Sequence, residues 1–422
     1  MAWSHPKYRP WWLALLACVG SALTIRQVLH AASARAIDFL HVWHAAHQFL
    51  AGAGAYHDPL FTYPPSGALL VAPAGGLAYS LARECMLAVN VACVMAAGLM
   101  LMRQLRGRLD AGALVAVLGV GALDAVASTW ANGNVNGILI LLEVVALGQF
   151  VRGRWPVGAA ALGLSLALKP VLLPMLALLV VRRQWRALLV AAGIPAMLLV
   201  IGCLTVPDAG RYLTVELPYL LHGAQLRYND SLVGLAFRLG VSSPVGLIVR
   251  MALLALATGL YLRSTRLATT RLDGRSVIFV ETGLVLSTTL LVSPMSEAYY
   301  TLFLLPSLLW WGMRGRGAGL ASAVVGVACF GTLRLTGVPG DVHHSWTLLS
   351  IRPTIGWIAL FCVCAGILAK AGRGAPTANV SRHSREYAVM PVGAFVPSDR
   401  DSTRGVPLTA GDDAWETRLG SL

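Results

Sequence analysis

Long apolar segments separated by short polar ones run through most of the sequence. A helix that crosses a bilayer needs about 20 mainly apolar residues, and ten segments meet or approach that length. They cover residues 11–32, 84–102, 110–128, 134–151, 187–206, 244–262, 277–292, 300–313, 318–335 and 354–369. The pattern predicts an all-α, polytopic membrane protein with about ten full spans.

Residues 156–181 are also apolar, but basic residues flank them on both sides. Lys169 and Pro170 stand at the midpoint, where a continuous helix would place a charge at the bilayer centre and lose a backbone hydrogen bond. We therefore predict a re-entrant hairpin of two half-length helices that turns at Lys169. A single kinked span, with the Lys169 side chain reaching toward the interface, is the alternative.

Composition indicates the class of protein, and the distribution of charge predicts its orientation in the membrane. Hydrophobic residues make up 57% of the chain and charged residues 12%, whereas soluble domains carry roughly 25% charged residues, so a soluble globular protein is excluded. The net charge of +14 comes mostly from Arg and Lys between the apolar segments. This is a topology signal and does not indicate a nucleic-acid partner. Because basic loops stay inside, both termini are predicted to be cytoplasmic in a plasma membrane.

Two polar regions complete the predicted organisation. The outer side carries a long first loop, residues 33–66, followed by an apolar stretch, residues 67–81, that we interpret as interfacial or re-entrant. After residue 372 the composition changes to Ser, Arg, Asp, Pro and Thr, which cannot bury enough apolar surface to fold. The sequence therefore predicts a transmembrane domain over residues 1–370 and a disordered cytoplasmic tail over residues 371–422.

The first outer loop holds the most informative residues. Asp38 precedes a segment with apolar residues on one helical face and His41, His44 and His47 on the other, which predicts an amphipathic helix. The Asp38 carboxylate is either the N-cap of that helix or a catalytic group. The three histidines lack a Cys or a further carboxylate at ligand spacing, so no metal site is predicted.

Several motifs occur in an order that resembles a known family. They are the acidic residue of the first outer loop, Tyr63-Pro64-Pro65, Asn134-Val135-Asn136-Gly137, Leu168-Lys169-Pro170, and Pro294 through Tyr299-Tyr300. Over roughly residues 30–310 this order resembles the polyprenyl-phosphate-dependent glycosyltransferases of family 87, which are of GT-C type. The stretch that begins at Asn136-Gly137 is similar in particular to the α-(1→3)-arabinofuranosyltransferases that branch cell-wall arabinan.

The resemblance implies a decaprenyl-phosphate sugar as the donor, no separate cofactor, and a cell-wall glycan hydroxyl as the acceptor on the outer face. Transfer of arabinofuranose from a β-linked phosphate to an α-glycoside is a single displacement with inversion. Such a step needs one carboxylate to accept the proton of the attacking hydroxyl, whereas a retaining route needs a nucleophile. Asp38 matches the position of the family's catalytic base.

The departing lipid phosphate needs a cation, and Lys169 and Arg227 are the candidates. For Lys169 the alternative is a structural ion pair with Glu143, which lies in the middle of a predicted span. Polar residues at the outer ends of the spans are assigned to acceptor or sugar binding, with helix capping and an interfacial aromatic belt as alternatives. They are Tyr63, Asn136, Asn229, Glu297, Tyr299 and Tyr300.

The exact sugar and acceptor stay open at this point. Glu297 and Asp230 replace an uncharged amide-like residue and a small hydroxyl residue of the arabinofuranosyltransferase pattern. A polyprenyl-phosphate-mannose donor is one alternative. A lipid or solute transporter is another, because buried charges and broken helices also occur in transporters, although no second half matches the Asp38 loop. Membrane lipids are expected partners, and the oligomeric state is left open.

Overall fold

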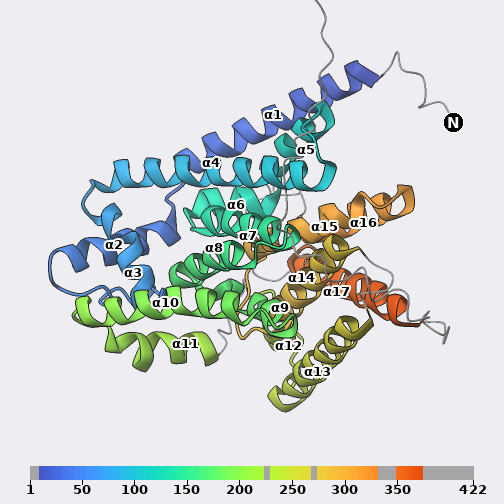
Figure 1. The fold of residues 1–422 in the computed structure, drawn as a ribbon. Coiled ribbons are helices and arrows are strands. Elements are labelled where there is room, and N and C mark those ends of the chain that lie inside the picture. Colours follow the sequence, from blue (N-terminus) through green and yellow to red (C-terminus); the bar gives the residue numbers. More distant parts are fainter. Residues whose placement is uncertain (1–8, 223–228, 268–272, 331–347, 374–422) are drawn as a thin grey trace, which may run out of the picture. The chain divides into compact units, whose positions relative to one another are not determined.

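The structure, a computed structural model, describes residues 9–222, 229–267, 273–330 and 348–373. All regular elements in these ranges are helices (Figure 1), and they belong to one compact unit, Met1–Ala375. The all-α prediction is therefore confirmed. The predicted tail lies outside the described residues, apart from residues 371–373, which end the last helix.

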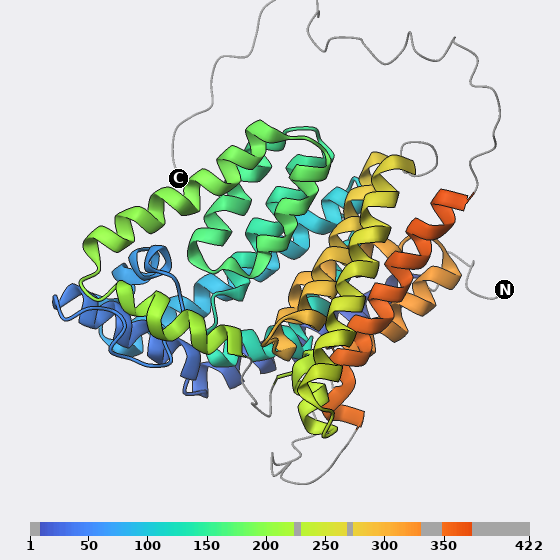
Figure 2. The ribbon, with the colours of Figure 1, turned by 90° about the horizontal axis from the view of Figure 1, so that it is seen from below.

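Six helices in the described ranges are long and apolar enough to cross a membrane. A helix satisfies its own backbone hydrogen bonds, which is the condition for crossing hydrocarbon. The six are α1 (Arg9–Ser33), α4 (Tyr79–Arg106), α10 (Trp185–Thr205), α13 (Ser243–Leu267), α14 (Gly274–Val292) and α17 (Leu348–Arg373). Three of them, α13, α14 and α17, pack side by side (Figure 2). The prediction of a polytopic membrane protein is confirmed.

A seventh candidate span is broken, and three predicted spans are short. The broken span consists of α5 (Ala111–Gly121) and α6 (Asp124–Asn132), which meet at 54°. The short elements are α7 (Asn136–Val151), the 3₁₀ helix η5 (Ala298–Leu304) with α15 (Leu305–Gly312), and α16 (Arg316–Phe330). Sixteen helical residues, as in α7, extend about 24 Å, whereas the hydrocarbon core is about 30 Å thick. A count of ten full spans is therefore not confirmed.

The predicted hairpin is present. Its pieces are α8 (Trp155–Leu168), the 3₁₀ helix η2 (Pro170–Met175) and α9 (Leu176–Val181). The backbone is extended at Lys169, between α8 and η2, because the following proline disfavours helix at this residue. The guanidinium of Arg182 lies 5.7 Å from the centre of the Trp155 ring, so the chain enters and leaves the hairpin at the same end. The alternative of one kinked span is wrong.

The segment between α1 and α4 and two later connections contain the remaining short helices. These are α2 (Ile37–Leu50), α3 (Pro65–Gly75), the π-helix η3 (Tyr212–Glu216), α11 (Leu217–His222) and α12 (Leu232–Arg238). Helix α2 is amphipathic as predicted, since Phe39, Val42, Ala45 and Ala46 are buried. It packs against α3, which has only 11 residues and contains Pro73. The apolar stretch over residues 67–81 therefore does not form a full span, in agreement with the prediction.

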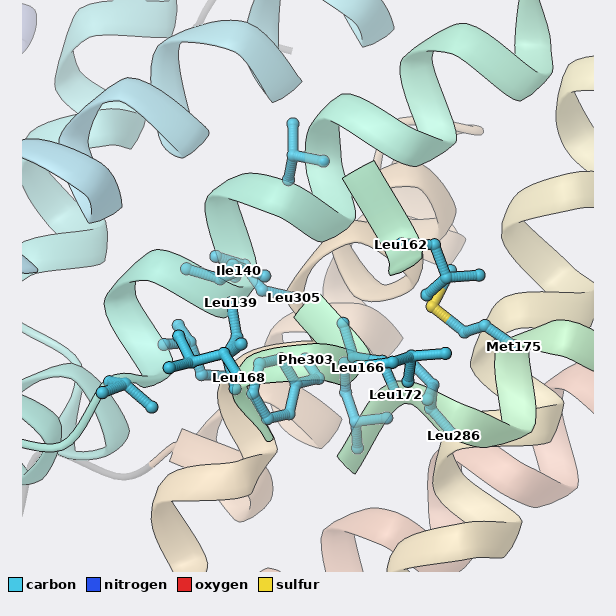
Figure 3. Packing of buried hydrophobic residues seen from close by; sticks show 14 of the residues in the cluster. Leu139, Ile140, Leu162, Leu166, Leu168, Leu172, Met175, Leu286, Phe303 and Leu305 are labelled. Carbon is cyan, nitrogen blue, oxygen red and sulfur yellow. The ribbon is translucent and has the colours of Figure 1, made fainter. Parts of the chain in front are cut away.

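A leucine-rich core holds the hairpin against η5 (Figure 3). The residues that Figure 3 labels come from α7, α8, η2, α14, η5 and α15, and they are Leu139, Ile140, Leu162, Leu166, Leu168, Leu172, Met175, Leu286, Phe303 and Leu305. All of them are buried, and burial of one such side chain contributes roughly 1.5–3 kcal/mol. This packing fixes the turn at Lys169 relative to the start of η5, which is where the polar site lies.

Candidate active site

Asp38 lies in the first turn of α2, at the edge of a polar cluster. The N-cap of α2 is Ala36, which has a left-handed backbone (φ 47°), so the hypothesis that Asp38 caps this helix is wrong. The Asn134 side-chain amide donates a hydrogen bond of 2.9 Å to Asp38 Oδ2. Asp38 is half-buried, and the contact orients its carboxylate toward the turn between α6 and α7.

Asn134 has a second contact that explains its position. Its Oδ1 accepts a hydrogen bond of 3.2 Å from the backbone N–H of Asn136, the first residue of α7. Asn134 therefore serves the start of α7 and holds Asp38 at the same time. Asn136 is fully buried, and neither side-chain atom has a hydrogen-bond partner among the described residues. Its assignment to sugar binding stays a prediction.

Lys169 lies between two tyrosine rings that are far apart in the sequence. Its Nζ is 5.2 Å from the centre of the Tyr63 ring and 5.0 Å from that of Tyr300, distances typical of cation–π interactions. The ammonium group also forms a hydrogen bond with the Tyr300 hydroxyl and lies within electrostatic range of Asp38. The structure thus brings Asp38, Tyr63, Lys169 and Tyr300 together.

The alternative of a structural ion pair between Lys169 and Glu143 is wrong. Glu143 is fully buried, and neither of its carboxylate oxygens has a hydrogen-bond partner in the part of the chain that the structure describes. The contacts of Lys169 are with Tyr63 and Tyr300. The ammonium group is therefore not used by Glu143.

Glu297 stands directly before η5 and belongs to the same cluster. Burial and the negative charge of Asp38 raise the pKa of its carboxyl, a hydrogen bond from Tyr299 and the charge of Lys169 oppose the increase, and the resulting pKa is about 7. The Tyr299 ring packs edge-on against Tyr300, with 4.8 Å between ring centres. Near pH 7 the Glu297 carboxyl is thus a group that can either donate or accept a hydrogen bond.

Asn229 is near this cluster, but its side chain is already engaged. Its Oδ1 accepts hydrogen bonds from the backbone N–H groups of Ser231 and Ser296, both at 3.1 Å. Its Nδ2 donates to the Pro294 carbonyl oxygen at 2.8 Å. This buried amide therefore holds the segment that leads into Glu297, and its assignment to sugar binding stays a prediction.

Asp230 extends the same support toward α17. Burial raises the pKa of its carboxyl to about 7, opposed by the nearby guanidinium of Arg238, whose Nη2 lies 3.7 Å from Asp230 Oδ1. The Asp230 carbonyl oxygen accepts a hydrogen bond of 2.6 Å from the Thr354 hydroxyl. The start of η5 is thus connected to α12 and α17.

Arg227, the other predicted phosphate ligand, lies outside the described residues.

The histidines of α2 point to a second polar group in the same loop. His41 Nδ1 is 2.8 Å and His44 Nδ1 is 3.6 Å from an oxygen of Asp58. His47 Nδ1 is 3.0 Å from the Gly75 carbonyl oxygen. The imidazoles of His41 and His47 therefore connect α2 to the rest of the loop and to α3.

Sequence reasoning missed the role of Asn134 toward Asp38. In the sequence, Asn134 is visible only as part of the motif Asn134-Val135-Asn136-Gly137. The contact joins positions 96 residues apart, so no local pattern could reveal it. The one available signal was a short polar turn between two apolar segments on the same side as Asp38.

Comparisons with known proteins show what this chain is similar to. The family model described as glycosyltransferase family 87 matches residues 61–294, so Asp38 and the start of η5 lie outside the matched range. An alpha-(1->3)-arabinofuranosyltransferase of Mycobacterium tuberculosis (strain CDC 1551 / Oshkosh) is 31% identical over 342 residues, which cover 78% of each chain. The protein of the same name from Mycolicibacterium smegmatis is 29% identical over 282 residues, 64% of this chain and 65% of its own.

A more distant relative has a different sugar in its name. It is a polyprenol-phosphate-mannose-dependent alpha-(1-2)-phosphatidylinositol mannoside mannosyltransferase of Mycobacterium tuberculosis, 25% identical over 369 residues, which cover 81% of this chain and 85% of the relative. No solved structure matches the chain.

Proposed function

This chain belongs to glycosyltransferase family 87, and on that premise we propose that it transfers arabinofuranose from a decaprenyl-phosphate donor to an arabinan or other cell-wall glycan hydroxyl. It is a multi-pass membrane glycosyltransferase. The transporter alternative has no support, because the relatives are glycosyltransferases. The names of two relatives support arabinofuranose as the sugar. The name of the third supports a polyprenyl-phosphate donor and keeps mannose as the alternative sugar.

One observation carries the proposal. A carboxylate oriented by Asn134 lies within electrostatic range of an ammonium group held between two tyrosine rings. Glycosyl transfer from a lipid phosphate needs these two groups: an acceptor for the proton of the attacking hydroxyl and a positive charge for the leaving phosphate. The two groups come from separate elements, α2 and the hairpin turn.

Asp38 is the proposed general base. Asn134 occupies Oδ2, which leaves Oδ1 without a hydrogen-bond partner among the described residues and so open to an acceptor hydroxyl. As the hydroxyl oxygen attacks the anomeric carbon, its proton passes to Asp38, and the bond from that carbon to the phosphate oxygen breaks. A single attack opposite the leaving group inverts the configuration, so a β-linked donor gives an α-linked product.

Lys169 is the proposed ligand of the lipid phosphate. Its ammonium stabilises the charge that grows on the phosphate oxygen as the glycosidic bond breaks. The Tyr63 and Tyr300 rings hold the cation in place without neutralising it, because their attraction comes from the ring faces. Glu297 and Tyr299 are the proposed contacts for sugar or acceptor hydroxyls, and Asn136 is a further candidate.

A donor-selection assay tests the proposal. Purified protein is incubated with a synthetic arabinan acceptor and either decaprenyl-phosphate arabinofuranose or polyprenyl-phosphate mannose, and the product is identified by mass spectrometry and NMR. We expect consumption of the arabinose donor and a new α-linked residue. Consumption of the mannose donor alone would replace the proposed sugar, and a β-linked product would contradict inversion.

Orientation is a separate part of the proposal: the site faces outside and both termini are cytoplasmic. Ala53 and Arg154 are exposed and lie on the outer loop and on the inner flank of the hairpin, respectively. In a variant without native cysteines, a membrane-impermeant thiol reagent should label Ala53→Cys in intact cells and label Arg154→Cys only after lysis. Labelling of Arg154→Cys in intact cells would invert the proposed topology.

A further inference from the structure

Asp208, which follows α10, forms two hydrogen bonds with the backbone of the first outer loop. Its carboxylate oxygens accept from the backbone N–H groups of Ala55 (2.8 Å) and Tyr56 (2.7 Å). Gly54 beside them has φ +98°, and a Cβ added there would lie 2.5 Å from the carboxylate carbon of Asp208. The loop is thus built to bring its backbone against this one carboxylate, although the two segments are about 150 residues apart.

Tyr56 connects the Asp208 carboxylate to Tyr63 at the candidate site. The residue is fully buried, and its hydroxyl donates a hydrogen bond of 2.8 Å to the carbonyl oxygen of Tyr63. Phe61 packs between the two rings, with its ring centre 5.5 Å from that of Tyr56 and 5.4 Å from that of Tyr63. The backbone of Tyr63 is therefore fixed from Asp208 through Tyr56.

The segment after Tyr63 is fixed to the hairpin itself. The Ser66 hydroxyl donates a hydrogen bond of 2.7 Å to the Ala167 carbonyl oxygen. A Cβ added at Gly67 would lie 2.7 Å from the Leu168 carbonyl oxygen. The Tyr63 ring is consequently held against the residues that directly precede Lys169, and its centre lies 5.2 Å from the ammonium nitrogen.

From these contacts we infer that Asp208 and Tyr56 are positioning residues for Lys169. The carboxylate of Asp208 fixes the loop, the hydroxyl of Tyr56 fixes the backbone of Tyr63, and the Tyr63 ring fixes the ammonium that receives the lipid phosphate. Neither residue belongs to the polar cluster around Asp38. The consequence for donor binding rests on the proposed function, whereas the consequence for the environment of Lys169 does not.

The variant Tyr56→Phe tests the hydrogen bond from Tyr56 to Tyr63 alone, because it removes one hydroxyl and keeps the ring. Tyr212→Phe is the matched control: its ring lies 6.0 Å from that of Tyr56 in the same aromatic group, and its hydroxyl does not bond to Tyr63. Asp208→Asn is a second test, since an amide can accept from only one of the two N–H groups and turns a donor toward the other.

Lysine acylation reads the position of Lys169 without any turnover. The chain has only three lysines, Lys7, Lys169 and Lys370, and the exposed Lys370 serves as the internal reference in peptide mass spectrometry. We expect Tyr56→Phe to increase the acylation rate of Lys169 about three- to tenfold relative to Lys370, as loss of one hydrogen bond allows. Tyr212→Phe should match the wild type. An unchanged rate in Tyr56→Phe, or an equal increase in both variants, overturns the inference.

Kinetics then test the link to the donor. We expect Tyr56→Phe to raise the KM for the lipid donor by about three- to tenfold, with kcat and the acceptor KM nearly unchanged. An equal change in both substrates indicates general loosening and overturns the positioning role. If the wild type consumes neither donor, the proposed function fails while the acylation experiment still decides the inference. Should Asp208→Asn fail to fold, the milder Tyr56→Phe variant carries the test.

Discussion

The two tyrosines beside Lys169 are held by different means. On one side, Tyr63 is fixed through Tyr56 and the Asp208 carboxylate, which accepts hydrogen bonds from two backbone N–H groups. On the other side, Tyr300 lies in the first turn of η5, and the segment before η5 is fixed by the Asn229 amide, which both accepts and donates hydrogen bonds. Both supports bond to backbone atoms, so each fixes the path of the chain rather than a single side chain.

The difference lies in charge. In the described residues the Tyr63 side presents a ring and backbone to Lys169, whereas the Tyr300 side brings the Glu297 carboxyl near, with its pKa raised to about 7 by burial. The comparison teaches that the two sides have separable roles. Substitutions on the Tyr63 side should change the position of the ammonium, and those on the Tyr300 side should also change how the site responds to pH.

The largest expected effect lies between the two sides, at Asp38. Asp38→Asn should lower turnover by on the order of 10² to 10⁴ because the proton acceptor is lost, while donor binding stays near that of the wild type. Glu84→Gln is the matched control, since Glu84 is an exposed carboxylate outside the cluster. Turnover near the wild-type value in Asp38→Asn would remove the proposed base.

Removing the Lys169 ammonium tests whether this group binds the lipid phosphate. Lys169→Met keeps an unbranched side chain of similar length and should raise the KM for the lipid donor by roughly 10- to 100-fold, because hydrogen bonds to charged groups contribute about 1.5–3 kcal/mol. The acceptor KM should change little. Isothermal titration with decaprenyl phosphate checks this, and unchanged affinity would show that Lys169 does not contact the phosphate.

Asn229→Ala tests the support on the Tyr300 side. It leaves two backbone N–H groups and one carbonyl oxygen without their partner in a buried place, at about 1–3 kcal/mol for each unsatisfied group. We expect clearly lower thermal stability in detergent and lower turnover. Asn132→Ala, which removes one side-chain contact on α6, is the control. Equal melting temperatures in the two variants would mean that Asn229 does not hold the segment before η5.

The smallest expected effect is a pH dependence of the donor KM that comes from Glu297 on the Tyr300 side and not from the Tyr63 side. Above pH 7 Glu297 ionises and adds a negative charge beside Asp38 and the lipid phosphate, so donor KM should rise roughly three- to fivefold between pH 6 and 8, as partly screened charges imply. Glu297→Gln stays neutral and should flatten this rise. Tyr56→Phe should keep this rise, because the variant removes no charge. A rise of the same size in Glu297→Gln would assign it to another group.

The folding stability should also depend on the titration of the Glu297 carboxyl. The pKa of Glu297 is about 7 in the folded chain and near 4.3 when unperturbed, so the folded state holds the proton more tightly between these values. Folding stability should therefore fall as pH rises from about 4.5 to 7, and Glu297→Gln should remove this part of the decrease. Melting curves at pH 5 and pH 7.5 provide the measurement.

Much of the fold was predictable because apolar length and proline position are local signals. The long helices and the turn at Lys169 follow from them directly. The span count was not, since hydropathy along residues 300–313 cannot tell a 3₁₀ turn followed by a short helix from one continuous helix.

The site was predictable only in part. Motif order brought Asp38, Tyr63, Lys169 and Tyr300 into view, and the structure places them together. The supports were not predictable, because Asn134 and Asp208 act across 96 and about 150 residues. The backbone contacts of Asn229 could not be foreseen either, because a buried amide bonded to backbone looks the same in sequence as one that faces a sugar.

The close approach at Gly54 also limits how this chain can vary. Any side chain there would collide with the Asp208 carboxylate and would have to adopt φ +98°, so the two positions cannot change independently. In a library in which both are randomised, selection for function should retain Gly54 wherever Asp208 is retained, and should accept larger residues at position 54 only together with a smaller residue at position 208. The loop between α2 and α3 and the segment after α10 therefore form one unit of sequence variation, although about 150 residues separate them.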